Sequence, residues 1–455
     1  MELKRDIYKK LLQWKNDDTG RVLQVSGARQ VGKTYILKKF ANKNFQHVVY
    51  INMAESFGKQ FLQCLDKVNE WEPGTPREEK PIHKAFELFD REFRDTKDTV
   101  IIIDEIQESS RVFNLVRTLA REFDCYAIIT GSYLGRLLSK EFFLPAGDFE
   151  NLTLETLTFP EFAEVFGKRE LYESIDLFGG SAPEQYEELK ECFKLYQRIG
   201  GYPSVVNMYL EHKSLERCDA ELGRLMSIFT NESKRYFDDV METDTFEKLF
   251  HGIAVTLIRE KQGAGDLVED LSKIVYKQES GRFTKKMINH AISWLRSSHI
   301  IGYASKSIDC DYLNIKENDR FYFLDVGIAH YFVARAGADE ATISGIVAEN
   351  FVYLSLLRRI SKDIAGNAPW FATYGKIKGE LDFFVRSLVD YNNYGIEVKA
   401  GSNSGKTVSR LLQDGKIDYV YYLKGDTQGG RTEDKKTQTV PLYLADRITF
   451  NLGKE

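Results

Sequence analysis

Two glycines, a lysine and a threonine near the start of the chain are spaced to bind phosphate. They fit the pattern G-x-x-x-x-G-K-[ST] and fall between a short β-prone run, "RVLQVS", and the helical stretch "TYILKKF". Glycines let the backbone curl so that its N–H groups face phosphate oxygens, and the following helix N-terminus adds a partial positive charge. The alternative is a loop that merely turns the chain, and the complete motif in its context weighs against it. The residues expected to cradle a nucleotide are Gly27, Ala28, Arg29, Gln30, Val31, Gly32, Lys33 and Thr34.

A phosphate loop of this kind needs an acidic strand beside it, and "VIIIDEIQ" meets that need. Its apolar run is typical of a parallel strand buried on both faces, and it ends in Asp104 and Glu105. We expect Lys33 to reach the β and γ phosphates, Thr34 to ligate Mg²⁺, and Asp104 to support the metal through water. Glu105 would polarise the hydrolytic water as general base. Taken alone, such a strand more often simply reaches solvent.

A third apolar run, "CYAIITGSYLG", reads as a strand followed by a polar turn. A hydroxyl at this turn could sense the γ-phosphate, and we favour Ser132, with Thr130 as the runner-up. A turn capped by serine explains the same residues without any ligand.

A second group with possible chemistry lies near the C-terminus. "KGELDFFV" places Asp382 beside an apolar strand, and "YGIEVKAG" carries Glu397 and Lys399 with Val398 between them. Side chains of a strand alternate, so Glu397 and Lys399 should share one face. Two carboxylates on adjacent strands can bind Mg²⁺, and the lysine can help to generate hydroxide or steady a scissile phosphate. An isolated ExK is more often a solvent-facing strand.

The bulk properties bound the architecture around these groups. At 455 residues, and about 150 residues per domain, three or four domains are expected. The net charge of -5 excludes a strong overall attraction to nucleic acid or an acidic membrane, so such binding requires a local patch. Five scattered cysteines argue against a disulfide framework or a zinc site and favour a cytoplasmic protein, and no apolar run approaches membrane-spanning length. Leu3, Ile7, Leu11 and Trp14 predict an N-terminal docking helix.

The segments "GARQVGKT", "IIIDEIQ", "ITGS", "LTLETLTFPEF" and "RIGGYP", in this order, resemble the AAA-type ATPases of bacteria and archaea that carry a C-terminal restriction-endonuclease-like domain of unassigned function. The resemblance implies an α/β fold with a doubly wound parallel sheet, a helical lid, a winged helix and a PD-(D/E)xK nuclease-like α/β domain. It also implies ATP rather than another nucleotide. The expected domains are 1–165 for the P-loop ATPase, 166–240 for the lid, 241–340 for the winged helix and 341–455 for the nuclease-like region.

The family pattern also points to individual residues. Glu349 lies on the helix that in the family packs beside the ExK hairpin and often adds a metal-binding carboxylate, so the metal set becomes Glu349, Asp382 and Glu397. Asp148 stands where the family usually has an arginine after glycine, and Arg136 could take over its charge or be merely solvated. The glycines of "RIGGYP" could bring the lid to the nucleotide, or form a plain turn between helices.

Two modules are candidates for contact with nucleic acid. In "TKKMINHAISWLRSSHII" one helix face is apolar and the other carries Lys286, Asn289, Ser293 and Arg296, which could enter a DNA groove or simply face solvent or a neighbouring domain. Residues 346–455 hold 16 Lys/Arg against 13 Asp/Glu, a difference of +3 that weakly favours a phosphate backbone.

These observations support an ATP-driven switch that controls a nuclease-like domain acting on DNA or RNA. A second hypothesis is a signalling or scaffold protein in which the C-terminal fold is a catalytically inactive interaction module. A small-molecule kinase shares the phosphate loop but lacks supporting features elsewhere. Self-association is open, and no membrane partner is expected.

Overall fold

The computed structural model describes residues 2–69, 80–132, 142, 147–237, 244–261, 285–376, 379–400 and 406–454. Contacts divide the chain into two compact units. The N-terminal unit comprises Arg5–Glu155 with Ser297–His299, and the C-terminal unit comprises Met1–Lys4, Thr156–Arg296 and Ile300–Glu455. The finer division into four domains stays a prediction. In the described residues no helix is long and apolar enough to cross a bilayer.

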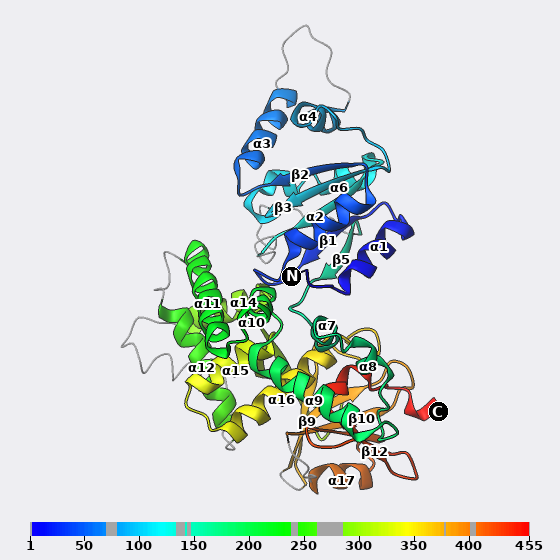
Figure 1. Cartoon of the computed structure of the whole chain (residues 1–455). Helices are drawn as coiled ribbons and strands as arrows, with labels where there is room; N and C mark the ends of the chain where they lie inside the picture. The colour runs from blue at the N-terminus through cyan, green and yellow to red at the C-terminus, as the bar shows by residue number, and fades with distance from the viewer. Residues whose placement is uncertain are drawn as a thin grey trace. The chain divides into compact units, whose positions relative to one another are not determined.

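A five-stranded parallel sheet forms the centre of the N-terminal unit (Figure 1), in the order β2-β3-β4-β1-β5. The interior strand β3, between β2 and β4, is buried at every residue, as its apolar run predicts. All five strands point the same way, so their carboxyl ends share one edge of the sheet. Their bounds are β1 Val22–Ser26, β2 His47–Asn52, β3 Thr99–Asp104, β4 Tyr126–Thr130 and β5 Phe149–Thr153.

Helices cover both faces of this sheet, as a doubly wound fold requires. Ile101 and Ile103 belong to one core cluster together with residues of α3 (Ser56–Asn69), α4 (Pro81–Phe89) and α6 (Val116–Glu122). Ile102 faces the other layer because strand residues alternate, and α2 (Lys33–Asn44) contacts β2 and β3 from outside that cluster.

An N-terminal helix is present as predicted, α1 (Ile7–Asp17), but it begins after Leu3, which is buried outside the helix. Its buried residues are Ile7, Leu11 and Trp14, and the Trp14 ring lies 5.3 Å from the Tyr126 ring on β4. The described residues of this unit also form two short elements, η1 (Ile106–Glu108) and α5 (Ser110–Phe113).

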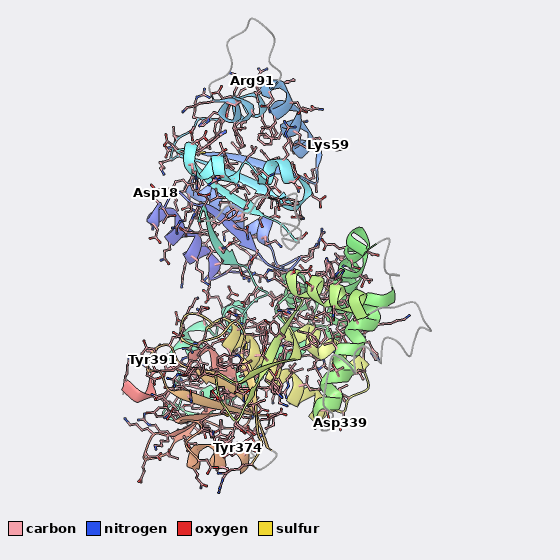
Figure 2. All side chains as sticks on the ribbon, turned by 180° about the vertical axis from the view of Figure 1, so that it is seen from behind. Asp18, Lys59, Arg91, Asp339, Tyr374 and Tyr391 are labelled. Atoms are coloured by element: carbon pink, nitrogen blue, oxygen red, sulfur yellow. The ribbon has the colours of Figure 1, made fainter. Side chains whose placement is uncertain are left out.

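The C-terminal unit combines a helical layer with a mixed sheet. Several of its helices follow residue 166, where a helical segment is predicted. The Asp339 carboxylate, labelled in Figure 2, caps the N-terminus of α16 (Glu340–Leu357). The helices are α7 Phe159–Val165, α8 Arg169–Ser174, α9 Pro183–Ile199, α10 Pro203–His212, α11 Leu215–Phe237, α12 Asp244–Lys261, α14 Lys285–Ser297, α15 Val326–Arg335, α16 Glu340–Leu357 and α17 Lys406–Gln413. Two 3-10 turns, η3 (Leu442–Arg447) and η4 (Leu452–Lys454), follow near the end of the chain.

Eight strands form the sheet of this unit, in the order β12-β13-β11-β10-β9-β8-β6-β7. The strands β6 and β7, which fall in the range expected for the winged helix, pair as an antiparallel hairpin. However, β6 also pairs in parallel with β8, so this hairpin belongs to the same sheet as the C-terminal strands. The bounds are β6 Ile301–Ile308, β7 Ile315–Phe323, β8 Trp370–Tyr374, β9 Gly379–Arg386, β10 Asn393–Lys399, β11 Tyr419–Lys424, β12 Gly430–Arg431 and β13 Thr437–Pro441.

The two glycines of "RIGGYP" lie at a tightly packed corner between α9 and α10. Gly201 N–H donates to Asp325 Oδ2 at 2.8 Å, and the same carboxylate accepts from Gly327 and Ile328 at the start of α15. A Cβ on Gly200 would lie 2.2 Å from Asp325 Oδ1. Burial raises the pKa of Asp325 in spite of these donors. The turn interpretation therefore accounts for both glycines by contacts within this unit.

The two residues considered for the family arginine, Asp148 and Arg136, have different outcomes. Asp148, which stands in place of the family arginine, forms an ion pair with Arg121 at 3.1 Å, so it is committed to α6 beside the sheet. Arg136, the side chain of Lys286 and residues 262–284 of the expected winged-helix range lie outside the described residues.

Candidate nucleotide and metal sites

The loop between β1 and α2 has a backbone that only glycine can adopt at two points. Gly27 has φ 142, and a Cβ there would lie 2.1 Å from the Leu154 carbonyl oxygen. Gly32 has φ 95 and precedes the first residue of α2. The two positive φ angles turn the chain from the end of β1 into the N-terminus of a helix, where unpaired backbone N–H groups collect. This is the strand–loop–helix context that the motif requires.

Lys33 points back into this loop. Its ammonium donates to the carbonyls of Gly27 and Ala28, both at 2.8 Å, and the side chain is buried. The two neutral carbonyls that accept from Lys33 can be exchanged for phosphate oxygens, which bear a full charge and make stronger hydrogen bonds.

Thr34 and Asp104 meet where β1 and β3 end. Thr34 Oγ1 donates to Asp104 Oδ2 at 2.6 Å, and Asp104 is itself 3 % exposed. The Tyr50 hydroxyl on β2 donates to the same oxygen at 2.9 Å, and burial together with the Asp104 carboxylate raises the pKa of Tyr50 far above its ordinary range. A hydroxyl and a carboxylate in contact are the hard oxygen ligands that suit Mg²⁺.

Glu105 begins the turn after β3 with a φ of 50, a left-handed conformation that is costly for a residue with a side chain. Its Oε2 accepts hydrogen bonds from Gln107 Nε2 at 2.5 Å and from Ser132 Oγ at 3.0 Å. Burial works to raise the pKa of Glu105, but the Gln107 hydrogen bond, the Arg29 charge and the Ser132 hydrogen bond outweigh it, so the pKa is lowered. Glu105 is therefore a carboxylate held ionised among polar groups.

The two candidate sensor hydroxyls after β4 differ in their surroundings. Ser132 contacts Glu105 and lies 3.4 Å from Gln107 Nε2, whereas Thr130 Oγ1 donates to the Val25 carbonyl at 2.8 Å. Since β4 lies between β1 and β3, Ser132 sits between the phosphate loop and the acidic strand. The geometry favours Ser132 for the sensing role, which stays a prediction.

In the C-terminal unit, Glu397 and Lys399 do share one face of β10. Lys399 Nζ lies 2.6 Å from Glu397 Oε1, and Glu397 is almost fully buried. Asp382 on β9 accepts a hydrogen bond from the Val398 N–H at 2.7 Å, so its carboxylate adjoins the same strand. The structure thus brings Asp382, Glu397 and Lys399 to neighbouring positions on two antiparallel strands.

The structure does not bring Glu349 to this group. Glu349 on α16 accepts from Tyr322 at 2.7 Å, and the Tyr322 ring packs on Phe383, whose Cα partner on β10 is Ile396. Glu397 follows Ile396 and so points to the opposite face, where its partner Tyr422 packs with α17. Across the described residues no group of three or more His, Cys, Asp or Glu side chains is placed to hold a metal ion.

Glu349 instead pairs with a buried arginine. Arg320 on β7 lies 3.1 Å from Glu349, also pairs with Glu380, and its guanidinium lies over the Phe371 ring. Both side chains of the Arg320–Glu349 pair are nearly inaccessible, at 3 % and 5 % exposure. This buried pair joins the β6–β7 hairpin to α16.

Sequence reasoning missed three residues of the N-terminal site. Tyr50 holds Asp104, Gln107 holds Glu105, and Arg5 donates to the Val31 carbonyl of the phosphate loop at 3.1 Å. The glutamine follows the acidic pair closely enough for "DEIQ" to have suggested it. Tyr50 and Arg5 become visible only with the strand order and with the docking of the N-terminal segment.

The fold and the site together define a P-loop nucleotide-binding domain in the N-terminal unit. Residues 19–163 match the family model AAA_14, described as an AAA domain. Over a longer stretch, the chain is 24 % identical to an uncharacterized protein of Haemophilus influenzae across 395 residues, which is 83 % of this chain and 82 % of that protein.

Solved structures give weaker likenesses. A Walker-type ATPase of Pyrococcus abyssi matches with 14 % identity and a TM-score of 0.43, over 73 % of this chain and 96 % of that one. The ORC2 protein of Aeropyrum pernix, solved as ADPNP–ADP complexes, matches with 12 % identity and a TM-score of 0.34, over 74 % and 96 % of the two chains. These scores are too low to relate the arrangement of the whole chain to either protein.

Proposed function

We propose that this chain is a Mg²⁺-dependent ATPase whose nucleotide state is coupled to a restriction-endonuclease-like C-terminal region that binds DNA or RNA. The observation that best supports the ATPase is the 2.6 Å hydrogen bond between Thr34 Oγ1 and Asp104 Oδ2. It joins the phosphate loop to the acidic strand through two oxygen ligands suited to Mg²⁺. The AAA match over residues 19–163 supports the same function.

Each side chain then has a defined task. Lys33 would exchange the Gly27 and Ala28 carbonyls for oxygens of the β and γ phosphates, while Thr34 would hold Mg²⁺ and Asp104 would support it through water. Bound Mg²⁺ would neutralise charge on the phosphates. Glu105, kept ionised, accepts a proton from the attacking water, and Ser132 links that carboxylate to the end of β4.

Substituting the loop lysine tests the nucleotide site. Lys33→Ala should abolish Mg·ATP binding measured by calorimetry, together with phosphate release, because no other ammonium replaces it in the loop. Lys43→Ala is the matched control, since Lys43 is an exposed lysine in the last turn of the same helix. Unchanged binding and turnover in Lys33→Ala would refute the assignment. Phosphate release without a phosphorylated product would also exclude the small-molecule kinase.

For the C-terminal region, the proposed metal ligands are Asp382 and Glu397, with Lys399 beside them. Mg²⁺ commonly takes only one or two protein carboxylates and completes its shell with water, so two ligands suffice. The sequence of elements supports a nuclease-like core, since α16 is followed by β8, β9, β10, α17 and β11. Nucleic acid would also meet the exposed Asn289 and Ser293 of α14, in a winged-helix module.

A catalytically inactive interaction module is the second candidate, and specific contacts favour it. Glu349, expected as a third carboxylate, is paired with Arg320 on the other face, and Lys399 already neutralises Glu397. The two candidates differ in one assay. Metal-dependent cleavage of single- and double-stranded DNA and RNA should be lost in Asp382→Ala and Glu397→Ala if the region is a nuclease.

The exposed Glu433, in the turn between β12 and β13, supplies the control variant Glu433→Ala, which should cleave as the unsubstituted protein does. Cleavage that persists equally in all variants would indicate a contaminating enzyme, and absence of cleavage with intact ATP turnover would support the interaction module. Self-association and a cytoplasmic location stay predictions.

A further inference from the structure

Arg5, the first residue of the N-terminal unit, contacts two backbone carbonyls that are far apart in sequence. Its NH1 donates to the Val31 carbonyl at 3.1 Å, and its NH2 donates to the Glu155 carbonyl at 2.6 Å. Val31 directly precedes Gly32 in the phosphate loop. Glu155 is the residue after which the chain leaves this unit. One guanidinium therefore touches both the phosphate loop and the exit segment.

The sheet topology explains why these two segments are neighbours. β5 runs parallel to β1, with Thr153 opposite Ser26, so both strands end at the same edge. Beyond the strands, Leu154 N–H donates to the Ser26 carbonyl at 2.9 Å, and the Leu154 carbonyl leaves no room for a Cβ on Gly27. The exit segment thus lies directly against the start of the phosphate loop. These contacts involve Ser26 and Gly27 at the start of the loop, whereas Val31, near its end, is joined to the exit segment through Arg5.

The contact with Val31 also orients a donor. In a trans peptide the carbonyl and the following N–H point in opposite directions. With the Val31 carbonyl turned toward Arg5, the N–H of Gly32 points away from Arg5. In a loop that curls around phosphate, this is the side on which the phosphate oxygens would lie.

The chemistry of the side chain suits a link between two carbonyls. A guanidinium is planar and always charged, and it presents several N–H donors in a rigid fork. A lysine ammonium at the same place could satisfy either carbonyl but could not hold the two at a fixed separation. Arg5 is half-buried, which limits the water available to replace it.

We propose that Arg5 is a positioning residue that aims the Gly32 N–H at phosphate and ties the phosphate loop to the exit segment at Glu155. Through it, nucleotide binding stiffens the segment by which the N-terminal unit continues into the rest of the chain. This inference rests on the proposed nucleotide binding and adds the route by which that binding is transmitted.

The test combines affinity with local backbone protection in the full-length protein. Calorimetry gives the Mg·ATP affinity, and hydrogen exchange gives the protection of the backbone N–H groups of Lys33 and Leu154 with and without Mg·ATP. In the unsubstituted protein both should gain protection. Arg5→Ala should weaken affinity about tenfold, as expected for a lost charged hydrogen bond, and should abolish the gain at Leu154 while a gain at Lys33 remains.

Arg5→Lys separates positioning from mere structure. It should recover much of the affinity, because one carbonyl can still be held, yet leave Leu154 without the nucleotide-dependent gain. Lys4→Ala is the control, since Lys4 is exposed and pairs with Glu164 outside this unit. Its affinity and protection should match the unsubstituted protein.

The outcomes distinguish a failure of nucleotide binding from a failure of the Arg5 link. Unsubstituted protein that binds no nucleotide would remove the proposed function and this inference together. Intact binding with a normal Leu154 gain in both Arg5 variants would overturn the inference alone. If Arg5→Ala does not fold, as judged by circular dichroism, a full Leu154 gain in Arg5→Lys would by itself be sufficient to reject the link.

Discussion

Removing the positive partner of Glu349 should strongly destabilise the C-terminal unit. Arg320 and Glu349 are each at most 5 % exposed and lie 3.1 Å apart, so Arg320→Met would leave a buried carboxylate without its cationic partner, although the Tyr322 hydroxyl still donates to it. Breaking a buried pair from one side costs about 3 to 5 kcal/mol. Glu380, the other partner of Arg320, is half-exposed and can turn to water, so it adds little.

Replacing both partners should cost much less than the sum of the two single changes. In Arg320→Met with Glu349→Leu both charges of the pair are removed together, and the residual loss is the hydrogen bond from the Tyr322 hydroxyl to Glu349, about 1 to 3 kcal/mol. The single change Glu349→Leu leaves the buried arginine with the half-exposed Glu380 as its carboxylate partner and should cost about as much as Arg320→Met. The coupling between the two sites should therefore be at least about 3 kcal/mol and favourable to the pair.

The assay is urea unfolding followed by tryptophan fluorescence and by hydrogen exchange of α16, because a chain with two units need not unfold in one step. Calorimetric Mg²⁺ binding by the C-terminal region is measured on the same proteins. Additive single effects, with a coupling below about 0.5 kcal/mol, would refute the structural role given to this pair. Loss of Mg²⁺ binding in Glu349→Gln without loss of stability would indicate that Glu349 is a metal ligand.

Three further outcomes are expected. Tyr50→Phe removes one of the two hydroxyl donors to Asp104 and should weaken Mg·ATP binding about two- to tenfold in calorimetry. An unchanged affinity would show that the Tyr50 hydroxyl does not position the Asp104 carboxylate. The pKa of Glu105 is lowered below its ordinary 4.5, so its base form persists as pH falls. The acid limb of kcat/KM for ATP should therefore lie below pH 4.5. A limb that belongs to this residue and is centred above about pH 5 would contradict the direction of the pKa shift. Gly201→Ala would place a Cβ 2.2 Å from a backbone carbonyl oxygen and should destabilise the C-terminal unit by about 3 kcal/mol in urea unfolding. Gly345→Ala, in open space on α16, should stabilise the same unit by about 0.5 to 1 kcal/mol.

The N-terminal site could be predicted from sequence because its physics is local. Glycine at two loop positions, a lysine at a helix N-terminus and an apolar run that ends in two acids each leave a mark within a few residues. What the sequence could not supply was the strand order. Tyr50 reaches Asp104 only because β2 lies beside β3, and nothing in "HVVYIN" identifies its neighbour.

The C-terminal group was predictable in part. The alternation that places Glu397 and Lys399 together follows from the two-residue period of a strand. The placement of Glu349 depends on which face of the sheet α16 covers, and on a bulge in the β8–β9 pairing that shifts side chains between faces. Neither feature leaves a sequence signal. Arg320, which pairs with Glu349, lies on β7, in the range assigned to the winged helix, so the sequence did not link it to the C-terminal group.

Parallel topology has a consequence for coupling in the N-terminal unit. The strands that supply the phosphate loop, the acidic pair and Ser132 all end at one edge of the sheet, because every pairing among them is parallel. β5 obeys the same rule, so the chain must leave this unit at that edge as well, at Glu155. A nucleotide that reshapes the loop therefore acts within reach of the exit segment without any long relay of side chains. Arg5 needs to bridge only two carbonyls to make that proximity effective.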